Sequence, residues 1–75
     1  MKIKKKCILE ARKRMKDYNY VKWFCDDAME TQKMTKDELG LFMYNKIKNK
    51  EFNWGYIPSK EVEDFLMKCM VYCML

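Results

Sequence analysis

The sequence predicts an all-α fold: a compact bundle of about four helices, forming one domain over residues 1–75, with an aromatic-rich loop at residues 51–58. Hydrophobic residues make up 49% of the chain, enough to build a core although 36% of the residues are charged. Only two Gly and one Pro are present, too few for the many turns of a β fold. Apolar residues also recur at helical spacing in several segments.

The first two predicted helices cover residues 4–16 and 20–33. The first sets Ile8, Ala11 and Met15 against a lysine-rich remainder. The second has a wide apolar stripe, which predicts contact with two neighbours; it consists of Tyr20, Val21, Trp23, Phe24, Cys25, Ala28 and Met29. Only Asp17 or Asn19 could cap a second helix here, so one continuous helix through residues 18–20 stays open.

Clearer signals mark the next two helices. Thr35 and Glu38 have the spacing of a capping box, and Met34 can pack against Leu39 across it; this helix should end near Lys50. Ser59 after Pro58 is a good N-cap for the last helix. The apolar pattern of that helix is the most regular in the chain: Val62, Phe65, Leu66, Cys69, Met70, Cys73 and Met74.

The last helix has more apolar surface than one face of a bundle needs. Met67, Val71, Tyr72 and Leu75 lie off its regular stripe. A helix that is apolar nearly all round is either central in its bundle or shared with another chain. We therefore expect either a central position or a homodimer through this helix.

The net charge of +5 is unevenly distributed along the chain. Residues 1–16 carry a local charge of +7, residues 17–38 carry −3, and the remainder carries +1. This segregation predicts a molecule with a basic end and an acidic middle.

The residue types needed for catalysis are scarce. The chain has no His, and two glycines cannot build a phosphate-binding loop. Cys69 and Cys73 lie one helical turn apart, yet no cysteine knuckle exists elsewhere, so we interpret all four cysteines as core residues. The sequence therefore predicts a protein that is not an enzyme and that holds no cofactor or metal.

The sequence also indicates where in the cell the protein is found. No apolar signal core follows the basic start, and the most apolar stretch, residues 65–75, is too short to span a membrane. We expect reduced thiols, a cytoplasmic location and no membrane partner.

The segment at residues 56–66, YIPSKEVEDFL, resembles the final segment of small excisionase-type DNA-binding modules, in which a strand ends and a helix begins. It covers 11 of the 75 residues, and the preceding helices do not follow that family's pattern. No function is carried over from it.

Concentrated charge without catalytic groups favours a binding protein. We expect one that occupies a surface on a larger protein or nucleoprotein complex, as inhibitors of host defence and other accessory proteins of phages or mobile elements do. Candidate partner-binding residues combine the lysines and aromatics around the loop with the extra apolar residues of the last helix: Lys46, Lys48, Lys50, Asn53, Trp54, Tyr56, Met67, Val71 and Tyr72. The acidic residues Asp26, Asp27, Glu30, Asp37 and Glu38 either cover helix surface, paired with the first helix, or enter a basic groove of a partner.

The alternative is a small DNA- or RNA-binding regulator. Lysines beside an amide and stackable rings suit a nucleic-acid surface, as at Lys46–Lys50 and Trp54. The basic N-terminus would follow the phosphate backbone through Lys4, Lys5, Lys6, Arg12, Lys13 and Arg14.

Overall fold

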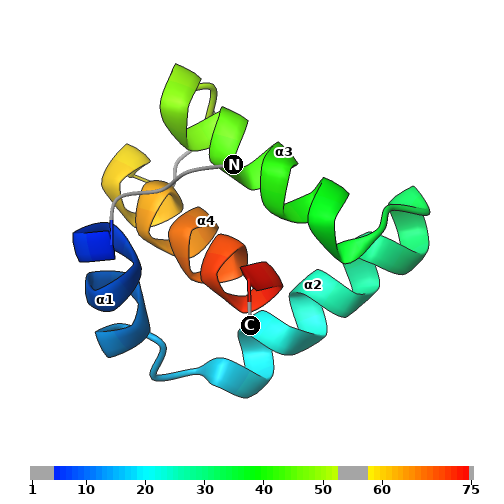
Figure 1. Cartoon of the computed structure of the whole chain (residues 1–75), viewed down its shortest axis with the longest axis horizontal. Coiled ribbons are helices and arrows are strands. Elements are labelled where there is room, and N and C mark those ends of the chain that lie inside the picture. Colours follow the sequence, from blue (N-terminus) through cyan, green and yellow to red (C-terminus); the bar gives the residue numbers. More distant parts are fainter. Residues whose placement is uncertain (1–4, 53–57, 75) are drawn as a thin grey trace.

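The protein is a bundle of four α-helices, described by a computed structural model over residues 5–52 and 58–74. The helices are α1 (Lys5–Lys13), α2 (Tyr18–Gln32), α3 (Lys36–Asn49) and α4 (Ser59–Met74) (Figure 1). None of the described residues belongs to a strand, so the predicted all-α fold is confirmed. Its dimensions of 29 × 27 × 24 Å are those of a compact globule.

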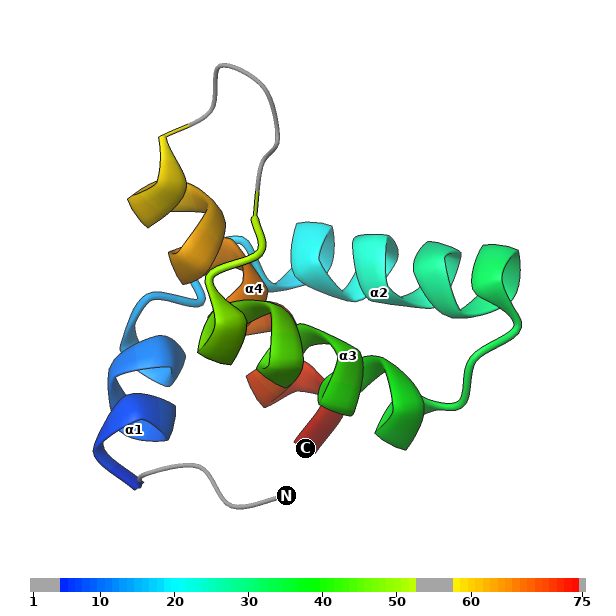
Figure 2. The same cartoon turned by 90° about the horizontal axis from the view of Figure 1, so that it is seen from above.

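Helix α4 is the central helix of the bundle. It packs against each of the other three helices, whereas α1 packs against α4 alone among the described elements. In Figure 1, α1 lies on one side of α4, and the hairpin of α2 and α3 lies on the other. Figure 2 shows α2 and α3 spreading apart from the turn that joins them, with α4 against the hairpin at its wider end.

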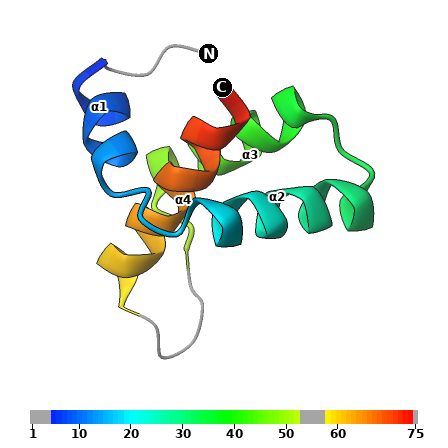
Figure 3. The same cartoon turned by 90° about the horizontal axis from the view of Figure 1, so that it is seen from below.

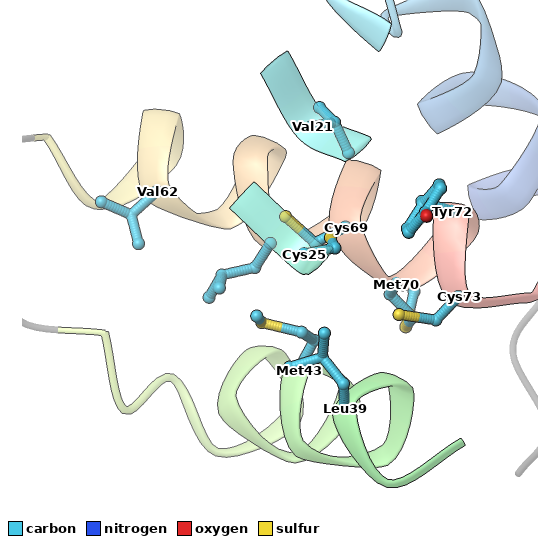
Figure 4. Close-up of a cluster of buried hydrophobic side chains, with 10 residues drawn as sticks. Val21, Cys25, Leu39, Met43, Val62, Cys69, Met70, Tyr72 and Cys73 are labelled. Carbon is cyan, nitrogen blue, oxygen red and sulfur yellow. The ribbon is translucent and has the colours of Figure 1, made fainter. Parts of the chain in front are cut away.

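The main core forms where α2, α3 and α4 meet. Side chains from all three helices converge there (Figure 4). Its buried members are Val21, Cys25, Leu39, Met43, Val62, Leu66, Cys69, Met70, Tyr72 and Cys73. Each fully buried large side chain of this kind contributes about 1.5–3 kcal/mol, and α4 supplies six of the ten.

The described apolar residues of α4 that lie off its regular stripe pack against other helices of the same chain. Residues two apart on a helix point about 200° away from each other, so Cys69 and Val71 need different neighbours. Both are fully buried, and Met67 lines a hollow between α1 and α4 together with Cys7 and Ala11. Helix α4 therefore has the central position. Its apolar surface no longer requires a second copy of the chain.

The break between α1 and α2 is real, and the continuous helix is excluded. Helix α1 ends at Lys13, three residues earlier than expected, and Arg14 then turns to Asp64 on α4, with Nη1 and Oδ1 2.7 Å apart. Asp17 occupies the N-cap position of α2, but its side chain makes no capping bond. Tertiary contacts, rather than a strong cap, thus set this boundary.

The start of α3 follows the sequence signal closely. Thr35 Oγ1 accepts from the Glu38 amide, and Glu38 Oε1 accepts from the Thr35 amide, which completes the predicted capping box. At α4, the Val62 amide donates to the Pro58 carbonyl, so Ser59 is the first helical residue rather than the cap.

Two lysines end helices in an unfavourable backbone conformation. Lys33 follows α2 and Lys50 follows α3, both at φ 53°. In each case the next amide reaches back five residues: Met34 to the Met29 carbonyl, and Glu51 to the Lys46 carbonyl, both at 3.1 Å. This left-handed closure is usually made by Gly, since a Cβ costs about 1–2 kcal/mol there.

Replacing Lys33 by Gly should therefore stabilise the protein. We expect Lys33→Gly to raise the free energy of unfolding by about 0.5–1 kcal/mol, because relief of the Cβ clash exceeds the added flexibility of the unfolded chain. Urea unfolding followed by circular dichroism measures it. Lys48→Gly, inside α3, is the control and should lower stability by a similar amount.

Candidate functional site

The side of α2 opposite the core carries an exposed aromatic pair. Val21 and Cys25 take the inward positions, whereas the side chains of Trp23 and Tyr20 are 62% and 56% exposed. The expectation that Tyr20 and Trp23 belong to the core-facing stripe is wrong. Trp23 lies two positions along the chain from each of these inward residues, and that spacing places it about 200° round the helix from them.

Neighbouring rings hold this aromatic pair. The Tyr20 ring centroid lies 6.0 Å from that of Trp23 and 5.8 Å from that of Phe65 on α4. Phe65 in turn meets Phe24 edge-on at 4.9 Å. Such ring pairs each contribute about 0.5–1.5 kcal/mol beyond area burial. Tyr20 is therefore packed against α4, and Trp23 packs against Tyr20.

Carboxylates surround Trp23 along the same side of the helix. Trp23 lines a shallow hollow of about 310 Å³; the other lining residues are Asn19, Lys22, Asp26, Asp27 and Glu30. We call these six residues, with Tyr20, the Trp23 surface. Three acids against one lysine give it a local charge of −2. In Figure 3 none of the other three described helices lies against the outer side of α2.

Among the described residues, one of the three carboxylates, Asp26, has bonds within the chain. Asp26 accepts from Lys22 Nζ at 2.8 Å and from the buried Tyr72 hydroxyl at 2.9 Å. The Lys22 bond, then the Tyr72 bond, hold the pKa of Asp26 below its ordinary value. Within residues 5–52 and 58–74, Asp27 and Glu30 have no ion pair or side-chain hydrogen bond.

Tyr72 links the Trp23 surface to the core. Its ring meets that of Tyr18 edge-on at 6.0 Å and lies 4.7 Å from Lys36 Nζ. Burial first, and then the bond to Asp26, raise the pKa of its hydroxyl to about 12. Tyr72 is 7% exposed, so it supports α2 from beneath and offers no surface to a partner.

The Tyr72 hydrogen bond should make stability fall at alkaline pH. The native state keeps a proton that the unfolded chain loses near pH 10, so this stabilisation is complete below about pH 10 and lost toward pH 12. We expect Tyr72→Phe to lower the urea midpoint at pH 8, with the difference from the native protein shrinking by pH 11. Tyr18→Phe is the control. A difference that stays constant with pH would contradict this assignment.

Three of the four cysteines meet in the core. Cys25, Cys69 and Cys73 are buried, Cys7 is half-buried, and all four are free thiols. The contact with Cys69, with burial adding to it, raises the pKa of Cys25 to about 12, and the pKa of Cys73 is raised by Cys25. The thiols of Cys25 and Cys73 therefore stay protonated, and the three buried cysteines pack as apolar groups. Among the described residues no cluster of three or more ligands suits a metal ion.

The three lysines predicted near the loop do not share one face. Lys46 and Lys48 are two residues apart on α3, and therefore point about 200° apart. Lys46 Nζ lies 5.4 Å from the Phe42 ring, whereas Lys50 closes the helix. The remaining residues of this predicted surface, Asn53, Trp54 and Tyr56, lie outside the described residues.

Helix α1 carries a group of exposed cations. Lys5, Lys6 and Lys13 line a shallow hollow around Leu9, which is 48% exposed, and Arg12 is also exposed. Arg14 differs, because Glu10 at 2.8 Å and Asp64 at 2.7 Å both engage it. Arg14 therefore anchors α1 to α4, and Lys4 lies outside the described residues.

No family model, no curated protein and no solved structure matches this chain. Within the described part of the chain, no helix is long and apolar enough to cross a membrane.

Proposed function

We propose that this protein is a non-enzymatic binding protein that docks its Trp23 surface on a basic region of a larger protein or nucleoprotein complex, and so inhibits or modulates it. The observation that supports the proposal is the 62% exposed Trp23 at the centre of an acidic helix face. It replaces the loop lysines and the C-terminal helix as the leading candidate surface.

An exposed tryptophan fixed by neighbouring rings is well suited to anchor an interface. Tryptophan buries a large area on binding and is enriched among the residues that dominate binding energy. Because Trp23 already packs against Tyr20, which in turn packs against Phe65, less side-chain freedom is lost when a partner covers Trp23.

Glu30 brings α2 little stability of its own. Asp26 and Glu30 are four residues apart, a spacing at which like charges repel by about 0.2–0.5 kcal/mol. Glu30 also lies near the C-terminal, negative end of the helix dipole, and the last turn holds no basic residue. A partner with a basic surface would turn these unfavourable charges into attractive ones and would speed association.

Inhibition by occupying a surface needs no catalytic group, which suits a chain of 75 residues without His. An accessory factor of a phage or mobile element, directed against a host protein, remains the biological setting that we propose.

Removing the tryptophan should release the partner. We expect Trp23→Ala to reduce retention of the partner by the tagged full-length chain at least tenfold, because hot-spot truncations cost about 2 kcal/mol or more. Pull-down from host lysate with quantitative mass spectrometry measures it.

Leu41→Ala, which removes an exposed apolar side chain on α3, is the matched control and should retain the partner. Equal retention by the native chain, Trp23→Ala and Leu41→Ala would contradict the proposed surface.

A nucleic-acid-binding regulator is the second candidate. The exposed cations of α1, Lys5, Lys6, Arg12 and Lys13, favour it, because within the described residues none of them forms an ion pair. These cations would contact phosphates, whereas the carboxylates of α2 would repel them.

Salt dependence tests this candidate. We expect the logarithm of the binding constant for a labelled duplex to fall linearly with the logarithm of salt concentration, with Lys5→Gln, Lys6→Gln and Lys13→Gln each reducing the slope by about 0.9. Fluorescence anisotropy over a salt series measures it. No binding at low salt excludes this candidate.

A further inference from the structure

We infer that the Trp23 surface recognises an arginine side chain on the partner, whose guanidinium stacks on the Trp23 ring while its N–H groups bind Asp27 or Glu30. This inference rests on the proposed function and specifies the chemistry of the partner.

The free carboxylates lie at the right spacing from the indole. Asp27 is four residues after Trp23, and Glu30 is three residues after Asp27, so each is a neighbour of the one before it on the helix surface. Asp26 is already bonded to Lys22 and Tyr72, which leaves Asp27 and Glu30 to receive a new cation.

Trp23 is 62% exposed, which leaves ring surface for a stacking partner. Tyr20 approaches Trp23 from the preceding turn, with the two ring planes tilted by 34°. The shallow hollow of about 310 Å³ extends along the helix from Trp23 to the carboxylates. A cation over a Trp face is attracted by the quadrupole of the ring, even at an exposed site.

Arginine fits this arrangement better than other groups. Its planar guanidinium can stack and donate a bidentate pair at the same time, whereas the lysine ammonium is a compact, strongly hydrated point charge. Phosphate groups of nucleic acid or anionic lipid would be repelled by Asp27 and Glu30. The occupant is therefore an arginine-bearing protein surface.

A pair of matched peptides tests this inference on the full-length chain. One acetylated peptide carries three arginines separated by glycines, and the other carries lysines at the same positions. Titrations are followed by NMR at the Trp23 indole N–H, which Trp23→Phe assigns. We expect the arginine peptide to shift this signal and to bind about three to ten times more tightly than the lysine peptide.

Charge-neutral variants identify the carboxylates. The double variant Asp27→Asn with Glu30→Gln should lose most of the difference between the two peptides. The control, Glu51→Gln with Glu61→Gln, removes two exposed carboxylates elsewhere and should preserve the difference. Circular dichroism checks that both double variants are folded.

Three outcomes would overturn the inference. The first is equal affinity for both peptides, and the second is no shift of the Trp23 signal. In either case the proposed function still stands if retention of the partner depends on Trp23. Sedimentation showing a dimer that Arg12→Ala abolishes would replace the partner's arginine by that of a second copy. If partner retention is also independent of Trp23, the proposed function fails as well.

Discussion

The fold depends on covering α4 from all sides. Its sixteen residues, Ser59–Met74, include seven that are buried, and they point in opposite directions from the helix axis. A single neighbour can cover one stripe of a helix, so α4 requires at least two layers around it. The α2–α3 hairpin covers Cys69 and its neighbours, and α1 covers the opposite side. A chain of this size buries only about 60% of its unfolded surface, so placing its most apolar helix at the centre uses that limited burial well.

Helix α2 has two separate roles because its two sides face different environments. Val21 and Cys25 fill the core, while Trp23 faces away from it. The Tyr72–Asp26 hydrogen bond joins the two sides, since it connects a buried residue of α4 to a carboxylate beside Trp23. The position of the exposed surface is therefore tied to the packing of α4. A binding surface on a rigid helix loses less entropy on association than one on a loop.

Charge is separated in space as well as in sequence. The acidic middle does not pair with the basic first helix: the described ion pairs of α1 and its following turn use Glu10 and Asp64. Helix α1 contacts α4 and not α2, so the cations of α1 lie on a different helix from Asp27 and Glu30 of α2. Two surfaces of opposite sign on one small domain would attract different partners, which is why the two candidate functions use different helices.

The sequence by itself determined the all-α class, the approximate bounds of the last two helices and the capping box at Thr35, because periodicity and capping depend on residues within a few positions of each other. The break between α1 and α2 was left open by the sequence and was decided by tertiary contacts. Only the tertiary structure decided which apolar residues are buried. The wide stripe of α2 held more apolar residues than the core could accept, and the direction of α4 selected Val21 and Cys25 over Tyr20 and Trp23. One local signal was present, since Trp23 shares its side of the helix with Asp27 and Glu30. Whether Val71 and Tyr72 are buried likewise depended on the docking of α1 and α2 against α4. These are long-range contacts that no local pattern encodes.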